Sequence, residues 1–170
     1  GGNDLINILV IEDDMIQSQH LINIVSSEIE EIKLYNISIN GKEALEIIDK
    51  GNVDIILLDL NLPDISGVEI SSYISDNNID KYMNSIVVIS GDSNLISQLP
   101  SFCYSYICAI IHKPIIYNDL IYKLSEIVKF KNKIKTDNVI KNKINRELEY
   151  LKFNFSHNGT RYLAETIFEL

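Results

Sequence analysis

Acidic side chains follow two apolar runs of this 170-residue sequence, at the point where each run ends. Glu12 and Asp13 come directly after the run from Leu5 to Ile11, and Asp59 follows the run from Val53 to Leu58. Carboxylates crowded at one site repel one another, and a divalent cation offsets that repulsion. Mg²⁺ prefers oxygen ligands and is typically held by one or two carboxylates plus a phosphate. These acids therefore predict a magnesium site, in which Asp59 is placed to act as a nucleophile toward a phosphoryl group.

A hydroxyl group and an ammonium group follow two further apolar runs. Ser90 comes after the run from Ile86 to Ile89, and Lys113 comes after the run from Ile107 to Ile111. Such donors neutralise and orient phosphoryl oxygens in phosphoryl-transfer sites. Together with Asp59 they predict phosphoryl transfer to a carboxylate.

The elements that must position these side chains follow from periodicity. Five apolar runs are rich in Ile and Val at nearly every position, which is typical of strands buried on both faces of a parallel sheet. They cover residues 5–11, 34–39, 53–58, 86–89 and 107–111. Helical spacings of three and four cover residues 15–29, 41–50, 67–77, 94 to about 104 and 118 to about 133.

This alternation predicts an α/β fold with a five-stranded doubly wound parallel sheet over residues 3–130. In such sheets ligands bind at the carboxyl ends of the strands, beside the topological switch point. The acids, the hydroxyl and the ammonium group are therefore expected to meet at one edge.

The ordered set of motifs resembles the receiver domain of response regulators in two-component signalling, which has a flavodoxin-like fold. The matching residues are Glu12 and Asp13 after "ILVI", Asp59 in "LLDLNLPDISG", Ser90 in "IVVISGD" and Lys113 in "IHKPI". Their separations also agree with the family: 46 residues from Asp13 to Asp59, 31 to Ser90 and 23 more to Lys113.

The resemblance implies a role for each of these residues. Asp59 would be the phosphoacceptor for a sensor histidine kinase or phosphotransfer protein, and Ser90 and Lys113 would bind the phosphoryl group. Mg²⁺ would be held by Asp13 and Asp59 directly, by Glu12 through water, and by the backbone carbonyl of Asn61. The protein would be a signalling switch with limited self-phosphorylation and self-dephosphorylation, not an enzyme.

One position departs from the family pattern. The aromatic residue that the family couples to the Ser/Thr is replaced here by Ile110, and Tyr106 is a neighbouring ring that could contribute. Switching is therefore expected to act through Ser90 and the loop that follows it, with an aliphatic partner or with Tyr106. The resemblance also implies that partners or a homodimer dock on the surface formed by the fourth helix, fifth strand and fifth helix.

Other interpretations stay open. Asp14 is expected to cap the helix that begins near Met15, because Asp is a strong N-cap. A hydrolase with a phosphoaspartate intermediate would need a second acid two residues after its nucleophile, where this sequence has Asn61. The main alternative is a phosphate-independent protein-interaction module with a receiver fold.

Composition indicates a cytoplasmic protein without a membrane segment. No apolar run approaches the roughly 18 to 20 residues that span a bilayer, and no signal peptide pattern is visible. The charge is divided unequally: residues 1–130 carry 7 Lys/Arg and 19 Asp/Glu, and residues 131–170 carry 8 and 5. The basic part is expected to meet a polyanion, to dock on the acidic part, or to be an exposed Lys-rich helix.

Residues 131–170 are predicted to be a helical extension. The preceding helix is expected to run on or bend near Thr136, followed by a helix over about 139–152, a break at 153–158 and a last helix over about 160–168. The stretch "INRELEYLKFNFSHNGTRYLAETIFEL" resembles the opening of the helical DNA-binding domain of the sporulation master regulator, through Gly159 and Tyr162 to Glu165. This implies a truncated effector domain, with DNA binding expected only of a full-length protein. The alternative is a dimerisation or linker helix.

Overall fold

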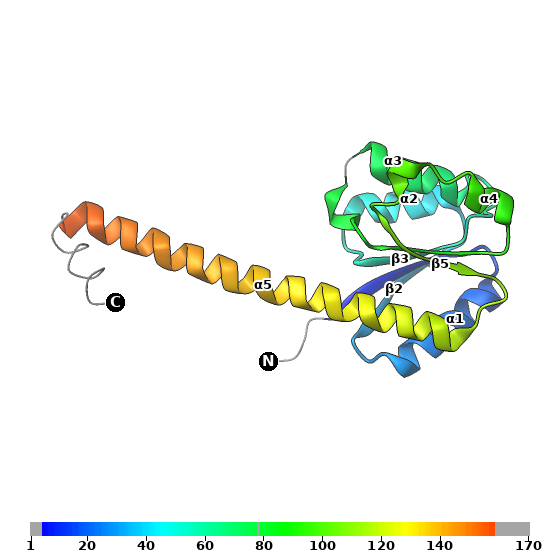
Figure 1. Cartoon of the computed structure of the whole chain (residues 1–170), viewed down its shortest axis with the longest axis horizontal. Coiled ribbons are helices and arrows are strands. Elements are labelled where there is room, and N and C mark those ends of the chain that lie inside the picture. The colour runs from blue at the N-terminus through cyan, green and yellow to red at the C-terminus, as the bar shows by residue number, and fades with distance from the viewer. Residues whose placement is uncertain (1–4, 78, 159–170) are drawn as a thin grey trace. The chain divides into compact units, whose positions relative to one another are not determined.

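Five parallel strands form one sheet in the computed structural model, which describes residues 5–77 and 79–158 (Figure 1). The strands are β1 (Ile6–Ile11), β2 (Ile32–Ser38), β3 (Ile55–Leu58), β4 (Ile86–Ser90) and β5 (Ile107–His112). Their order across the sheet is β2-β1-β3-β4-β5, and every neighbouring pair is parallel. The predicted fold class is therefore confirmed.

Helices cover both faces of the sheet. They are α1 (Met15–Glu28), α2 (Gly41–Lys50), α3 (Gly67–Asp76), α4 (Ser93–Ser97) and α5 (Tyr117–Asn158), with short 3-10 helices at Asp80–Tyr82 and Ser101–Cys103. Figure 1 shows α1 and the first turns of α5 on one face, and α2, α3 and α4 on the other.

Each face of the sheet has its own hydrophobic core. Leu9, Ile56 and Leu58 pack toward α2 and α3, whereas Ile8, Ile55 and Leu57 pack toward α1 and the start of α5. Successive residues of a strand point to opposite faces, so a strand covered on both faces is apolar at every position. This is why the central strands β1, β3 and β4 appear in the sequence as nearly continuous Ile-rich and Val-rich runs.

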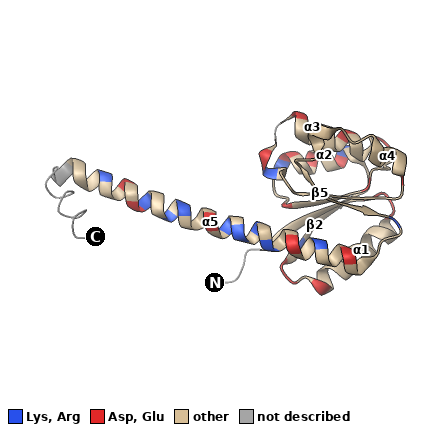
Figure 2. Ribbon diagram, in the orientation of Figure 1, with Lys and Arg blue, Asp and Glu red and all other residues tan. Residues whose placement is uncertain are grey.

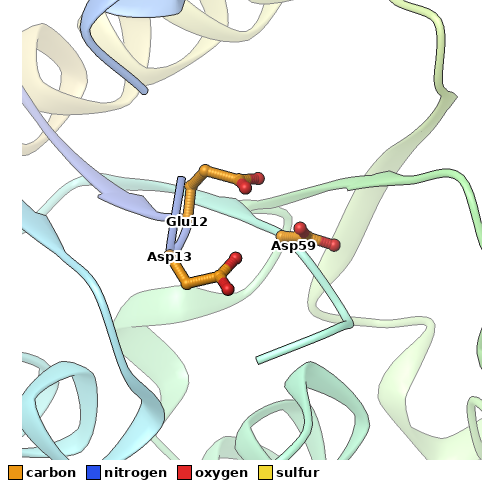
Figure 3. Close-up of side chains that lie close together, drawn as sticks. All are labelled: Glu12, Asp13 and Asp59. Atoms are coloured by element: carbon orange, nitrogen blue, oxygen red, sulfur yellow. The ribbon is translucent and has the colours of Figure 1, made fainter. Parts of the chain in front are cut away.

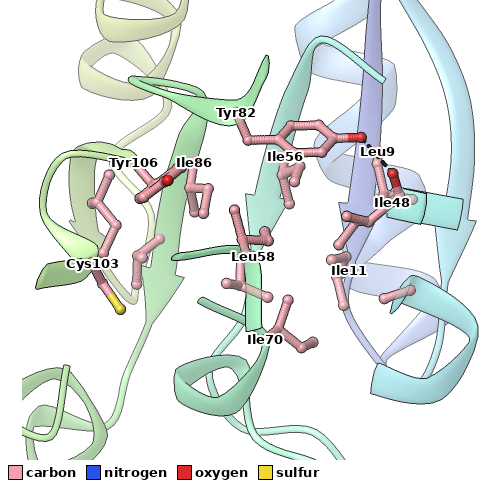
Figure 4. Close-up of a cluster of buried hydrophobic side chains, with 14 of the residues drawn as sticks. Leu9, Ile11, Ile48, Ile56, Leu58, Ile70, Tyr82, Ile86, Cys103 and Tyr106 are labelled. Atoms are coloured by element: carbon pink, nitrogen blue, oxygen red, sulfur yellow. Dashed lines mark hydrogen bonds between the residues drawn. The ribbon is translucent and has the colours of Figure 1, made fainter. Parts of the chain in front are cut away.

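Tyr82 lies in the hydrophobic core on the α2 and α3 side of the sheet (Figure 4). Its ring is fully buried, and its hydroxyl donates a hydrogen bond of 2.9 Å to the carbonyl of Ile48 at the end of α2. Burial raises the pKa of Tyr82 to about 12, which keeps the hydroxyl protonated. This hydrogen bond supports the fold, because burying a hydroxyl group without a partner costs free energy of folding.

The fourth helix is shorter than predicted. The sequence predicts a helix from residue 94 to about 104, but α4 covers only Ser93–Ser97 and a separate 3-10 helix covers Ser101–Cys103. Pro100 explains the correction, because proline lacks a backbone N–H and disfavours the helical conformation of the residue before it.

The predicted break at residues 153–158 is wrong, since α5 continues to Asn158. No Gly or Pro occurs between residues 115 and 158, so no residue there interrupts helical hydrogen bonding. Thr136 lies within α5, and its hydroxyl bonds back to the carbonyl of Asn132, 3.0 Å away, instead of capping a new helix. The predicted helix at 160–168 lies outside the described residues.

The chain divides into two compact units, Gly1–Lys129 and Phe130–Leu170. Lys and Arg side chains predominate along α5 after Phe130, whereas acidic side chains predominate on the first unit (Figure 2). Among the helices of the described ranges, none combines the length and apolarity needed to cross a bilayer.

Candidate functional site

Strand register brings the predicted acids together at the carboxyl edge of the sheet. Ile11 at the end of β1 pairs with Leu58 at the end of β3, and the next residue along, Asp59, donates its N–H to the carbonyl of Ile11 at 2.9 Å. Glu12 and Asp59 are therefore neighbours. β1 and β3 flank the point where the chain changes direction across the sheet, which is the expected ligand position in this architecture.

The three carboxylates occupy one small region. One oxygen from each of Glu12, Asp13 and Asp59 lies within 4.8 Å of the others, and Figure 3 shows the side chains extending into the same space. Glu12 and Asp59 are buried, at 7% and 6% exposure, while Asp13 is exposed. The cluster has the oxygen-only donor set that a hard divalent cation prefers.

Lys113 places a positive charge between two of these acids. Its Nζ lies 2.9 Å from Glu12 Oε2 and 3.1 Å from Asp59 Oδ2, with hydrogen-bond geometry to both. The register of β4 and β5 positions it, because Ser90 pairs with His112 and the carbonyl of Ser90 accepts the N–H of Lys113 at 3.0 Å. The peptide bond between Lys113 and Pro114 is cis.

Burial and neighbouring charges shift the pKa values of Glu12 and Lys113. The pKa of Glu12 is raised from 4.5 to about 7, chiefly because burial disfavours the anion and also because Asp59 lies beside it, although Lys113 opposes the shift. Burial would lower the pKa of Lys113, but its two carboxylate partners outweigh that effect and raise it. A mostly apolar pocket of about 160 Å³ contributes the low-dielectric surroundings through Leu57 and Ile89.

Asp14, the third acid after β1, has a different role. Its carboxylate accepts the N–H groups of Ile16 and Gln17 at 3.0 and 3.1 Å, so it is the N-cap of α1. These hydrogen bonds, that of Gln17 first, lower the pKa of Asp14. The predicted capping role is confirmed.

A second cavity, a cleft of about 400 Å³, opens beside Asp59. It is lined by Asp59, Asn61, Ser90, Gly91, Asp92, Ser93 and Lys113. Ser90 is fully buried at the end of β4, and its hydroxyl accepts the N–H of Asp92 at 3.1 Å. The backbone N–H of Asn61 donates to Asp59 Oδ1 at 3.1 Å. The other five predicted site residues therefore lie around Asp59.

Asp64 and Gly67 support the site, although the sequence did not predict a role for either residue. The carboxylate of Asp64 accepts the N–H groups of Gly41 and Lys42, at 2.7 and 2.9 Å, and so ties the loop after β3 to the start of α2. Desolvation alone would raise the pKa of Asp64, but these N–H groups hold it at about 2. Gly67 packs so tightly that a Cβ atom there would lie 2.6 Å from the carbonyl oxygen of Asp59.

A local signal for the position of Gly67 exists in "PDISGVE". Ser66 and Glu69 form a capping box at the start of α3, and the S-x-x-E spacing that marks it is visible in the sequence. It places Gly67 at the first helical position. The contacts of Asp64 and Gly67 with other segments are tertiary and have no local signal.

Ile110 and Tyr106 lie on the same side of the sheet. Ile110 is half-buried against the core that includes Leu58, and Tyr106 is buried in that core (Figure 4). A ring held at 5% exposure is already inside, so Tyr106 supplies no exposed aromatic side chain beside Ser90.

Comparisons with known proteins agree with this architecture. Residues 8–125 match the family described as response regulator receiver domain. A protein-glutamate methylesterase/protein-glutamine glutaminase from Methanospirillum hungatei is 29% identical over 150 residues, which cover 87% of this chain and 41% of that protein. The chain thus spans less than half the length of that relative. The polar-differentiation response regulator DivK from Brucella anthropi is 27% identical over 113 residues, covering 64% of this chain and 87% of DivK.

A solved structure shows the same fold. The response regulator protein TrrA from Thermotoga maritima, in complex with Mg²⁺-BeF, superimposes with a TM-score of 0.59 and 23% identity, covering 72% of this chain and 99% of TrrA. The family match extends from β1 into α5 and includes the acid cluster, Ser90 and Lys113. Through residues 8–125, the chain belongs to the response regulator receiver domain family.

Proposed function

We propose that this receiver accepts a phosphoryl group on Asp59 from a sensor histidine kinase or phosphotransfer protein, and that Mg²⁺ is required. The main support is the position of Asp59: it accepts a hydrogen bond from Lys113 and lines a cleft that Ser90 and Lys113 also line. An anionic oxygen, an ammonium group and a hydroxyl group around one open space are the parts that phosphoryl transfer uses.

The transfer exchanges one bond to phosphorus for another. A carboxylate oxygen of Asp59 attacks phosphorus, the bond from phosphorus to the donor nitrogen breaks, and the donor imidazole leaves with that electron pair. Lys113 stabilises the negative charge on the phosphoryl oxygens, and Ser90 donates a hydrogen bond to them. Water later hydrolyses the acyl phosphate, so the protein acts as a switch and not as an enzyme with a substrate to turn over.

Glu12, Asp13 and Asp59 fit a Mg²⁺ ion, because all three offer carboxylate oxygens within one 4.8 Å region. The backbone carbonyl of Asn61 is proposed as a further ligand. Bound Mg²⁺ supplies positive charge that offsets the charge on the phosphoryl oxygens. The complex of TrrA with Mg²⁺-BeF supports this assignment.

The proposal is tested by incubating the chain with Mg²⁺ and acetyl phosphate and measuring its intact mass. We expect a gain of one acid-labile phosphoryl group, and no gain when Mg²⁺ is chelated. A chain that stays unmodified while a known receiver is modified under the same conditions would contradict the proposal.

Asp13 and Asp14 provide a matched pair of variants. Asp13→Asn is expected to abolish Mg²⁺ binding and phosphoryl uptake, because it removes an anionic ligand. Asp14→Ala is expected to keep both and to lower the midpoint of thermal unfolding by a few degrees, because the N-cap of α1 is lost. Titration calorimetry with Mg²⁺ and thermal unfolding measure the two effects, and equal Mg²⁺ affinities for both variants would argue against a ligand role for Asp13.

Mg²⁺ affinity is expected to rise with pH between 4.5 and about 7, because Glu12 holds a proton in the folded protein over that range. Release of one proton on binding gives up to about tenfold per pH unit. The stability of the metal-free fold is expected to change with pH in the opposite direction. The folded chain binds this proton more tightly than the unfolded chain does, so the contribution of Glu12 to the free energy of unfolding is full below pH 4.5 and is lost above pH 7. Glu12→Gln should flatten both profiles, and an unchanged slope would mean that another group titrates.

The partner surface is proposed to include the face formed by α4, β5 and the start of α5. Tyr122 is exposed there, at 66%, and a groove of about 390 Å³ passes Ile110 and Tyr122. An exposed aromatic side chain beside a groove is typical of interaction sites. Because Ile110 replaces the usual aromatic residue, phosphate-independent binding is the second candidate. Partner binding that is identical for the wild type and Asp59→Asn, with and without acetyl phosphate, would favour it.

We also infer an output beyond the receiver. Transcriptional output is a proposal that rests on the resemblance of residues 144–170 to a helical DNA-binding domain, whose marker residues Gly159 and Tyr162 to Glu165 lie outside the described residues. The relatives have different lengths beyond their receivers, so the receiver alone does not identify the output.

A further inference from the structure

The part of α5 that belongs to the second unit carries an uncovered apolar stripe. Ile134, Ile144 and Leu148 are 42%, 54% and 51% exposed, and Phe130 and Leu151 on the same side are 52% and 36% exposed. An amphipathic helix gains most of its stability from burying such a stripe against a partner.

The stripe follows a heptad repeat through the described helix. Two sets of residues recur every seven positions, one set lying four residues after the other: Phe130, Asp137, Ile144 and Leu151, then Ile134, Lys141, Leu148 and Phe155. This is the spacing of a two-stranded coiled coil, with Ile134 at an a position and Phe130 at a d position. The repeat spans about 39 Å at 1.5 Å per residue.

The charged residues in the middle of the repeat indicate in which direction a second, identical helix would pair. Asp137 and Lys141 are the charged residues of the seam, and they lie next to each other at its centre. In a parallel pair of identical helices, Asp137 would face the same Asp and Lys141 the same Lys. In an antiparallel pair centred on residue 139, a positions meet d positions, so each Asp137 faces Lys141 of the second copy.

The same antiparallel register pairs the apolar positions on both sides of this layer. Ile134 then faces Ile144 of the second copy and Phe130 faces Leu148, so apolar residues meet on both sides of the charged layer. Beside the seam, Lys133 comes opposite Glu147 of the second copy, a pair of opposite charge. Complementary charges of this kind select the partner and the direction of a coiled coil.

We propose that residues 130–148 of α5 form an antiparallel coiled coil with a second copy of this chain, and that the layer of Asp137 and Lys141 sets its direction. The interface uses no residue of the phosphorylation site. Phosphoryl uptake on Asp59 and pairing of α5 are therefore separate properties, and a failure of one leaves the other standing.

Sedimentation equilibrium of the full chain tests the pairing. The wild type is expected to dimerise, and Ile144→Asp to raise the dissociation constant at least about a hundredfold, because a charge is buried without a partner. Val139→Asp is the matched control: Val139 is 67% exposed on the opposite side of the helix, so its dissociation constant should stay within about threefold. Phosphoryl uptake by each variant shows that the receiver is folded. A monomeric wild type, or equal dimerisation of both variants, would overturn the proposal.

Disulfide crosslinking tests the direction. Chains carrying Ile134→Cys are mixed with chains carrying Ile144→Cys, oxidised, and their linked peptides identified by mass spectrometry. The antiparallel pairing predicts that residue 134 of one copy links to residue 144 of the other. Links of 144 to 144 and of 134 to 134 as the main products would show a parallel pair and overturn the antiparallel assignment.

Discussion

The Asp59→Asn variant is expected to take up no phosphoryl group from acetyl phosphate and Mg²⁺ under conditions in which the wild-type chain gains one. The amide nearly matches the shape of the carboxylate but has no anionic oxygen to attack phosphorus. Asp59 is the acid at which the contact with Lys113 and the cleft of Ser90 coincide, so no neighbouring carboxylate is placed to replace it. Intact mass measured before and after acid treatment gives the result directly.

The same variant should also change the titration of Glu12. Asp59 contributes to the raised pKa of Glu12 through a hydrogen bond and through its charge, so Asp59→Asn is expected to lower the pKa of Glu12 from about 7. A titration of the Glu12 carboxyl by NMR measures it. Asp119→Asn, at an exposed position in the first turn of α5, is the control that keeps both phosphoryl uptake and the Glu12 titration. Uptake by Asp59→Asn at the wild-type level would identify a different acceptor.

Gly67→Ala is expected to lower the free energy of unfolding and to weaken Mg²⁺ binding together. A Cβ at this position would lie 2.6 Å from the carbonyl oxygen of Asp59 and 2.8 Å from the Cα of Leu60, and backbone atoms cannot move aside as a flexible side chain does. Overpacking of this kind costs about 3 kcal/mol. Alanine returns at most about 1 kcal/mol through its better helix propensity. The net loss is therefore about 2 kcal/mol.

Gly91→Ala is the matched control for this effect. A Cβ at Gly91 would meet only the Cβ of Lys113, at 3.4 Å, so the substitution should change the free energy of unfolding by less than about 0.5 kcal/mol. Denaturant unfolding of both variants and calorimetry with Mg²⁺ provide the comparison. If Gly67→Ala were as stable as Gly91→Ala, the close contact between α3 and the end of β3 would not constrain the site.

The core of the site was predictable because it depends on strand ends. A strand buried on both faces must be apolar throughout, so the first polar residue after it marks the point where the chain leaves the sheet. Glu12 and Asp59 are such residues, Lys113 follows the end of β5 directly, and parallel strands bring their carboxyl ends to one edge. The N-cap role of Asp14 was predictable for a local reason, since its partners lie only two and three residues ahead.

Two helix ends were predicted wrongly, and both errors concern the residues that can end a helix. The apolar spacing of residues 94–104 continues past Pro100, which ends the helix regardless of the pattern. In α5, a break was predicted at residues 153–158, although no Gly or Pro is present to make one. Side-chain pattern reports which face is apolar, whereas backbone hydrogen bonding decides where a helix ends.

The sequence by itself determined the order of elements, the five strand ends to within one residue and the identity of the charged groups beside them. Local composition and periodicity carry that information, because each strand and cap depends on residues close to it in the chain. Only the tertiary structure decided that Lys113 bridges Glu12 and Asp59, that Asp64 holds the start of α2, and that Gly67 contacts the Asp59 carbonyl. These contacts join residues distant in sequence, and they depend on strand register and packing, which no local pattern records.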